Sequence, residues 1–195
     1  MSLASRAGDL FYTFRFLKAF TTPWPDTDAA KLGIVDENGK RNKSVKLDTD
    51  EKRDAYTPFL RLVYNIKRLV NMAPGGRSRM ASYAAGLMLL KDHFGMTDKG
   101  IDKILQGMEI DPLDLISEKN EWWLLPNGAI SPGVYQITNY KLTCETLDDI
   151  IYPKDKVMVH ENAFPVDEIL GIPIYKVTHI NTKKSVYVTL GELYK

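Results

Sequence analysis

A short glycine- and arginine-rich segment in the middle of the chain holds the residue types best suited to bind a ligand. Gly75 and Gly76 let a backbone approach a ligand closely. Ser78 is expected to cap a helix whose first N–H groups would face an anion. Arg77 and Arg79 would add fork-shaped donors that match a phosphate. The segment is not a P-loop, because it lacks the required spacing to a Lys-Ser/Thr pair.

This segment belongs to a longer basic stretch. Residues 55–90 contain no acidic side chain, and they carry five basic ones that we call the basic strip: Arg61, Lys67, Arg68, Arg77 and Arg79. A strip of this kind can contact a nucleic-acid backbone with an affinity that falls as salt rises. The alternative is a connection between two helices, whose arginines are solvated or paired with acids elsewhere in the fold.

Cysteine and histidine offer a second kind of chemistry, a nucleophile with its base. Cys144 with His160 or His179 can form such a pair. No spacing in the sequence supports the pairing, and all three fall in or near expected strands. We therefore interpret them as ordinary strand residues and predict no catalytic residue.

Paired carboxylates at Asp148-Asp149 and Asp167-Glu168 are a third candidate, for acid–base work or for a metal ion. Both pairs lie beside expected turns, where solvated loop charges are common. No cysteine or histidine spacing matches a zinc site. The sequence therefore predicts no metal and no cofactor.

Two adjacent tryptophans, Trp122 and Trp123, suggest an interface. Adjacent residues of a strand point to opposite faces, so one ring can enter a core while the other covers a second surface. That surface is either a partner protein or the neighbouring part of the same chain.

The length, composition and net charge of the chain limit the class of protein. The chain has 195 residues, 44% hydrophobic and 26% charged, with a net charge of +1. Basic residues outnumber acidic ones up to residue 110, and the reverse holds afterwards, which suggests two units that face different partners or each other. One cysteine and no apolar run near the roughly 20 residues of a membrane span predict a cytoplasmic protein at synthesis, without a membrane partner.

Apolar periodicity predicts helices in the first part of the chain. Asp9 is expected to cap a helix that Pro23 ends, and Asp48-x-x-Glu51 resembles a capping box. Pro58 either splits the helix that follows or marks the first turn of another. Two more helices are expected, one ending at Gly95 and one from Thr97 to about Gln106.

After residue 122 the pattern becomes that of short strands. Alternation predicts strands at 134–138, 156–160, 172–180 and 185–190, with turns at 126–128 and 181–184. The expected fold is α+β: a basic helical domain over 1–120, then a small domain over 121–195. We expect the second domain to be an SH3-like β-barrel or a curved antiparallel sheet.

Several segments resemble small proteins of large tailed bacteriophages. They are Phe11-Tyr12-x-Phe14-Arg15-Phe16-Leu17-Lys18, Leu32-Gly33-Ile34-Val35-Asp36-x-x-Gly39-Lys40, Phe59-x-Arg61-Leu62-Val63-x-Asn65-Ile66-Lys67-Arg68, Ala81-Ser82-Tyr83-Ala84-Ala85 and Leu170-Gly171-Ile172-Pro173-Ile174-Tyr175. The resemblance implies a head or prohead-core role and no catalytic residue. Leu190-Gly191-Glu192 also resembles the Leu/Ile-x-Glu pattern that some phage prohead proteases cut.

The sequence thus predicts a non-enzymatic phage structural or assembly protein. It would be made in the host cytoplasm, would enter the virion, and would contact other virion or assembly proteins. Its basic helical unit would contact either DNA or an acidic surface of another virion protein. The alternative is a phage-encoded nucleic-acid-binding regulator that acts in the host cytoplasm through the basic strip. A cysteine-dependent enzyme is the third hypothesis.

Overall fold

A computed structural model describes residues 3–73, 77–108 and 124–195 as two compact units. The first unit is Met1–Arg68 with Lys91–Ile110, and the second is Leu69–Leu90 with Asp111–Lys195. The expected domain boundary at residue 120 lies outside the described residues. The observed division differs from that expectation, because it groups residues 69–90 with the C-terminal strands.

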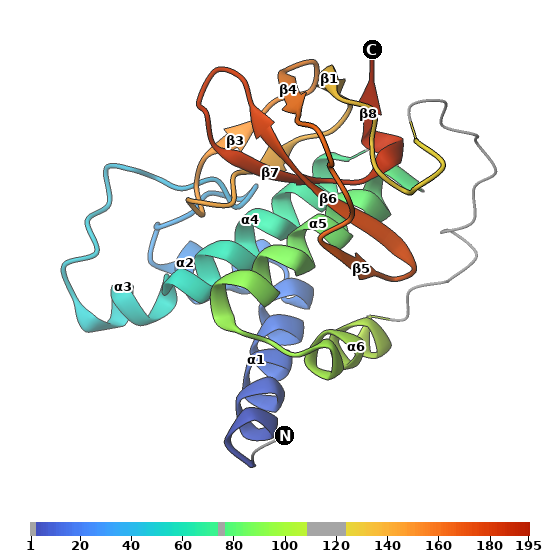
Figure 1. Cartoon of the computed structure of the whole chain (residues 1–195). Coiled ribbons are helices and arrows are strands. Elements are labelled where there is room, and N and C mark those ends of the chain that lie inside the picture. Colours follow the sequence, from blue (N-terminus) through green and yellow to red (C-terminus); the bar gives the residue numbers. More distant parts are fainter. Residues whose placement is uncertain (1–2, 74–76, 109–123) are drawn as a thin grey trace. The chain divides into compact units, whose positions relative to one another are not determined.

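Helices dominate the first half of the chain, as predicted (Figure 1). In chain order the helical elements are α1 (Leu3–Thr21), η1 (Trp24–Asp26), α2 (Asp28–Lys31), α3 (Asp50–Ala55), α4 (Pro58–Met72), α5 (Arg77–Phe94) and α6 (Asp98–Gly107). Pro58 is the first residue of α4, which confirms that it begins a separate helix. The cap of α3 is Thr49, whose hydroxyl accepts a hydrogen bond from the Lys52 N–H, so the predicted capping box at Asp48 was displaced by one residue.

Asp9 has a different role from the predicted one. It lies inside α1 rather than at its start, and it is buried. Its carboxylate accepts hydrogen bonds from the backbone N–H (3.1 Å) and the hydroxyl of Thr97, the N-cap of α6. The Thr13 hydroxyl donates to the Gly100 carbonyl, and a β-carbon on Gly100 would lie 2.8 Å from the Asp9 carboxylate. Asp9 therefore fixes α6 against α1 at a point where a β-carbon on Gly100 would force its carboxylate to shift.

The C-terminal part consists of antiparallel strands, which confirms the α+β class. They are β1 (Gly133–Ile137), β2 (Lys141–Leu142), β3 (Ile150–Ile151), β4 (Lys156–Val159), β5 (Asp167–Ile169), β6 (Ile172–His179), β7 (Ser185–Val188) and β8 (Leu193–Tyr194), with the 3-10 helix η3 (Leu190–Glu192) before β8. One sheet has the order β5-β6-β4-β1-β8, and β7 pairs with β6. Strands β2 and β3 form a separate two-stranded sheet.

Within the described strands the sheet is not closed into a barrel, so the SH3-like form is not confirmed. The main sheet ends at β5 and β8, of three and two residues. Strands this short leave few backbone groups for a further ladder. A single bridge, Thr143 to Val186, joins the segment after β2 to β7.

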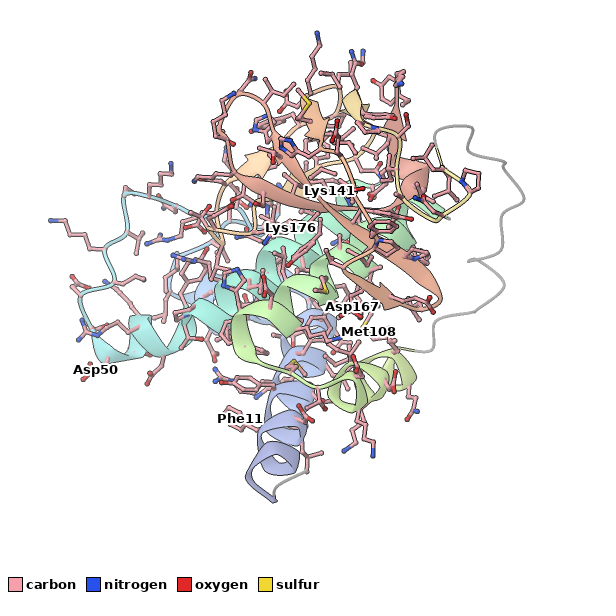
Figure 2. All side chains as sticks on the ribbon, in the orientation of Figure 1. Phe11, Asp50, Met108, Lys141, Asp167 and Lys176 are labelled. Atoms are coloured by element: carbon pink, nitrogen blue, oxygen red, sulfur yellow. The ribbon has the colours of Figure 1, made fainter. Side chains whose placement is uncertain are left out.

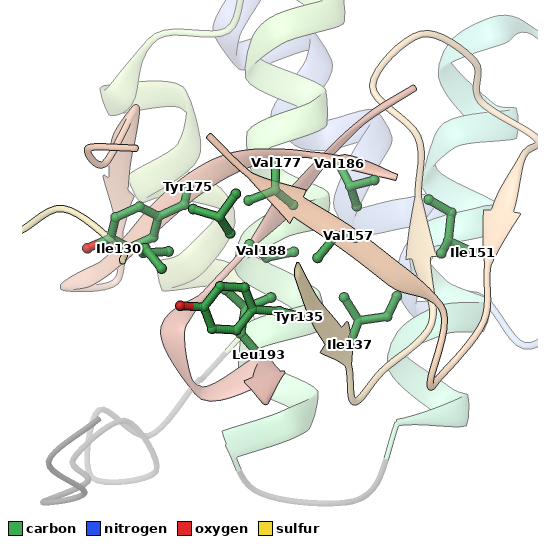
Figure 3. Packing of buried hydrophobic residues seen from close by; sticks show 11 residues of the cluster. Ile130, Tyr135, Ile137, Ile151, Val157, Tyr175, Val177, Val186, Val188 and Leu193 are labelled. Carbon is green, nitrogen blue, oxygen red and sulfur yellow. The ribbon is translucent and has the colours of Figure 1, made fainter. Parts of the chain in front are cut away.

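One buried apolar cluster of the second unit lies on one face of this sheet (Figure 3). Alternate residues of the paired strands supply it, as the twofold periodicity predicted: Tyr135 and Ile137, Val157 and Val159, Tyr175 and Val177, Val186 and Val188. The Tyr175 hydroxyl donates to the Gly128 carbonyl at 3.0 Å, and the Tyr135 hydroxyl donates to the Ser131 carbonyl at 2.7 Å. The Tyr175 hydroxyl therefore attaches the predicted turn at 126–128 to the core.

Candidate interaction surfaces

The basic strip is not a uniform exposed surface. Lys67 is only 8% exposed, its ammonium group donates to the Thr22 carbonyl, and it lies 4.3 Å from the centre of the Trp24 ring. Burial lowers the pKa of Lys67. Arg68 is half-buried and donates to the Asn65 side-chain oxygen at 3.2 Å. Lys67 thus serves the packing of the first unit and is not presented to a phosphate.

The remaining members of the strip fall into different parts of the structure. Arg61, half-buried, belongs to the first unit, whereas Arg77 and Arg79 belong to the second. Helix α5 begins at Arg77, so Ser78 lies inside the helix and not at its cap. Of the arginine pair, Arg79 has a described side chain, and it is exposed.

Other predicted site residues lie outside the described part of the chain. They are Gly75, Gly76, Trp122 and Trp123. Anion binding at the glycines and an interface at the tryptophans therefore stay predictions.

The histidines contact threonine and aspartate. The Nδ1 of His179 lies 2.8 Å from the Thr182 hydroxyl, and its Nε2 lies 3.6 Å from an Asp155 carboxylate oxygen. The Nε2 of His160 lies 3.3 Å from the Thr178 hydroxyl. Cys144 is buried and forms no disulfide, and its backbone N–H donates to the Ser185 carbonyl. The Thr182 contact lies within the hairpin turn after β6, whereas Asp155 belongs to the turn before β4.

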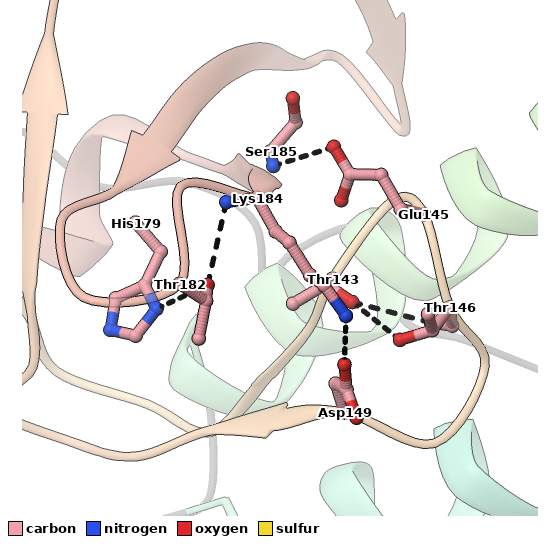
Figure 4. A network of polar contacts seen from close by, with 8 residues as sticks. All are labelled: Thr143, Glu145, Thr146, Asp149, His179, Thr182, Lys184 and Ser185. Carbon is pink, nitrogen blue, oxygen red and sulfur yellow. Dashed lines mark hydrogen bonds and ion pairs between the residues drawn. The ribbon is translucent and has the colours of Figure 1, made fainter.

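A network of polar contacts ties this hairpin to the segment between β2 and β3 (Figure 4). Glu145 accepts from the Ser185 N–H at 2.8 Å, and Lys184 forms an ion pair with Asp149. Partial burial would raise the pKa of Glu145, but the hydrogen bonds to its carboxylate prevail and lower it. Asp149, which belongs to one of the paired carboxylates of the sequence, is thus the ion-pair partner of Lys184. Among the described residues no three His, Cys, Asp or Glu side chains are grouped to hold a metal ion.

A buried ion pair in the second unit was missed by the sequence analysis. Lys141 and Glu192 are 2% and 1% exposed at their side chains, and they pair directly. Glu192 also accepts from the Thr189 N–H at 3.0 Å and from the Asn139 side chain at 3.1 Å. Burial lowers the pKa of Lys141, and the Glu192 charge opposes that shift. Glu192, the acidic residue of the protease-like pattern at 190–192, is thus enclosed, although Gly191 beside it is exposed.

The clearest exposed surface of the first unit is one side of α1. Leu10, Phe11 and Phe14 are 59%, 54% and 67% exposed, and Lys18 continues the same side of the helix. We call these four residues the α1 stripe. Figure 2 shows Phe11 on α1 among the side chains drawn as sticks. In the part of α1 whose side chains are described, from residue 8 onward, the opposite side carries the buried residues Asp9, Thr13, Phe16 and Ala19.

Comparison of the chain with known proteins identifies no relative. No protein-family model, no curated protein and no solved structure matches the chain. None of the described helices has the length and apolar character to cross a membrane. The fold and its surfaces thus define the class as an α+β protein with two compact units.

Proposed function

We propose that this protein is a non-enzymatic structural or assembly protein of a tailed bacteriophage, which acts through protein–protein contact. Two things support the proposal: the resemblance of several sequence segments to phage proteins, and the α1 stripe. The stripe is the observation that carries the contact role.

Large apolar side chains on one stripe of a helix favour a partner that removes them from water. Burial of exposed apolar surface contributes about 25 cal/mol per Å², and aromatic rings are enriched at interface centres. The rings of Phe11 and Phe14 extend from a helix whose other side is already packed. The stripe therefore presents a rigid surface that needs no folding on contact.

The charges beside the stripe indicate the kind of partner. Asp9 is the one acidic residue of α1, and it is buried on the opposite side. Lys18 is exposed on the stripe, and the Arg15 guanidinium lies 5.3 Å from the Phe11 ring centre. Complementary charge steers association and selects partners. The partner we propose is a particle protein with an apolar surface rimmed by acidic side chains.

The experiment is to follow the full-length chain into particles. Phe11→Gln with Phe14→Gln should lower its copy number in purified virions at least tenfold, measured by quantitative mass spectrometry, because the apolar contact is lost. Val166→Gln, at an exposed apolar residue of the second unit, is the matched control and should leave the copy number unchanged.

Two results would overturn the proposal. One is that the unaltered chain is absent from virions. The other is that the double variant enters them at the normal copy number while its circular dichroism and melting temperature match the unaltered chain.

The alternative function, a nucleic-acid-binding regulator in the host cytoplasm, has a separate observation in its favour. Lys40, Lys43 and Lys46 are exposed lysines of the first unit outside the basic strip, and they carry no acidic partner in the described structure. A shift assay across a salt series tests this alternative, and no binding at low salt would end it.

A further inference from the structure

A loop of the first unit has the most concentrated unpaired positive charge in the described structure. Residues 38–47 contain Lys40, Arg41, Lys43 and Lys46 and no acidic side chain. We infer that this loop, which we call the lysine loop, binds the phosphate backbone of nucleic acid. The inference deepens the proposed function by naming DNA among its partners.

Arg41 shapes the loop from inside. Its guanidinium donates to the carbonyls of Ile34 (3.1 Å), Val45 (2.6 Å) and Asn42, and it lies 5.3 Å from the centre of the Tyr56 ring. A planar fork with several donors can satisfy carbonyls in this way, whereas a lysine cannot. Arg41 is therefore a positioning residue, because its guanidinium donates to carbonyls of the loop.

The turn before Arg41 is fixed as well. The Asp36 carboxylate accepts from the N–H groups of Asn38 (2.9 Å) and Lys40 (2.8 Å), and Val35 bridges Arg41 across the turn. Gly39 takes a positive φ of 73°, and a β-carbon there would meet the Trp24 ring. The loop thus has a defined path although it has no regular secondary structure.

The three lysines of the loop are free to bind. Lys40, Lys43 and Lys46 are exposed, and within the described structure their ammonium groups make no ion pair or hydrogen bond. By contrast, Lys52 and Lys91 are paired with neighbouring aspartates. Successive members are three residues apart, so their backbone positions are separated by at most about 10 Å.

The surroundings favour phosphate over an acidic protein. None of the exposed large apolar side chains of the described chain lies in the loop. Protein interfaces usually need an apolar centre, whereas phosphate binding gains its free energy from counterions released by positive charge. Lysines act here as point charges, so the binding should not depend on base sequence.

The test measures how affinity for a labelled random-sequence duplex depends on salt. The full-length chain with Lys40→Gln, Lys43→Gln and Lys46→Gln should show a log–log slope smaller by about 2.7, since each duplex phosphate contact contributes about 0.9. The matched control removes the same charge from the same unit elsewhere, with Lys31→Gln, Lys99→Gln and Lys103→Gln, and should keep the slope.

Arg41→Lys provides a second readout. It keeps the charge but removes the fork that holds the carbonyls, so affinity should fall while the slope changes by less than one. Increased amide exchange at residues 38–47 should accompany this loss. An unchanged affinity in this variant would overturn the positioning role.

Three outcomes would overturn the inference itself. They are no duplex binding at low salt, equal losses in the loop and control variants, and equally strong binding of polyglutamate of matched charge, which would indicate an acidic protein instead. The loop variant should still enter virions, whereas the α1 variant should keep its salt slope. Failure of this inference is therefore distinguishable from failure of the proposed function.

Discussion

Lys67 in the first unit and Lys141 in the second are both buried lysines, but they are stabilised in different ways. The ammonium group of Lys67 contacts a carbonyl and an aromatic ring, which are neutral partners. That of Lys141 pairs with Glu192, a full opposite charge that is itself held by a backbone N–H. Burial lowers the pKa of both lysines.

The difference shows what each environment requires. A long side chain can place its methylene groups against apolar surface and bring its charge to a carbonyl at the margin of the packing. A charge with no route to water needs a charged partner, because desolvation costs several kcal/mol per ion. Neither lysine is available to a ligand. The binding surfaces that we propose, the α1 stripe and the lysine loop, are instead formed by exposed side chains.

The largest effect is expected where one partner of the ion pair is removed. Glu192→Gln leaves the Lys141 charge buried without a counter-charge and should lower the free energy of unfolding by about 3–5 kcal/mol. Urea denaturation followed by circular dichroism measures this loss. The double variant Lys141→Met with Glu192→Leu is the matched control and should recover only part of the stability, because the charge is gone but the Thr189 N–H and the Asn139 side chain lose their acceptor.

A small loss in the single variant would contradict this account. If Glu192→Gln costs less than about 1 kcal/mol, water reaches Lys141 and the contrast with Lys67 disappears.

A smaller effect is expected at Lys67. Lys67→Met keeps the apolar stem but loses the bond to the Thr22 carbonyl and the interaction with the Trp24 ring, at a cost of about 1–2 kcal/mol. The same denaturation experiment measures it. Lys18→Met, an exposed lysine of the first unit, is the control and should change stability by less than about 0.5 kcal/mol. If Lys67→Met lowers the free energy of unfolding as much as Glu192→Gln does, the neutral partners of Lys67 contribute as much to stability as the ion pair of Lys141.

Local signals in the sequence predicted much of the fold, because each depends on neighbouring residues. Pro23 and Pro58 delimit helices as expected, Gly95 follows α5 with a positive φ, and Thr97 caps α6. The alternation at 134–138 predicted β1 because one face of that strand is buried. These features follow from backbone geometry that a few residues determine.

The missed elements depended on partners distant in the chain. Strand β5 was read as an acidic loop segment, and its turn to β6 passes through Leu170 and Gly171, both with positive φ. The first of these positions, Leu170, is usually asparagine, aspartate or glycine in such a turn. Because it is leucine here, the sequence did not indicate the turn. Strands β2 and β8 are only two residues long, too short for a periodicity to appear.

The candidate sites were harder to predict, because charge in a sequence does not reveal burial. Lys67 lies in an acid-free run and was expected to bind phosphate, yet its partners are 43 to 45 positions earlier. The lysine loop has the same composition, but its exposed lysines depend on Arg41 occupying the interior. Which basic residue turns inward is decided by tertiary contacts. A short acid-free run beside a glycine turn was the signal that could have drawn attention to the loop.

The smallest expected effect is on pH dependence, and it separates the two lysines by titration. Burial lowers the pKa of Lys67 and of Lys141 below the ordinary value of 10.5. Between each lowered pKa and 10.5 the unfolded chain holds a proton that the folded chain has released, so stability rises with pH. The slope is at most about 1.4 kcal/mol per pH unit for each lysine. Denaturation from pH 7 to 10 should therefore give a steeper rise for the unaltered chain than for Lys67→Met or for the double variant at Lys141 and Glu192. Identical slopes in all three proteins would mean that neither buried lysine releases its proton in this range.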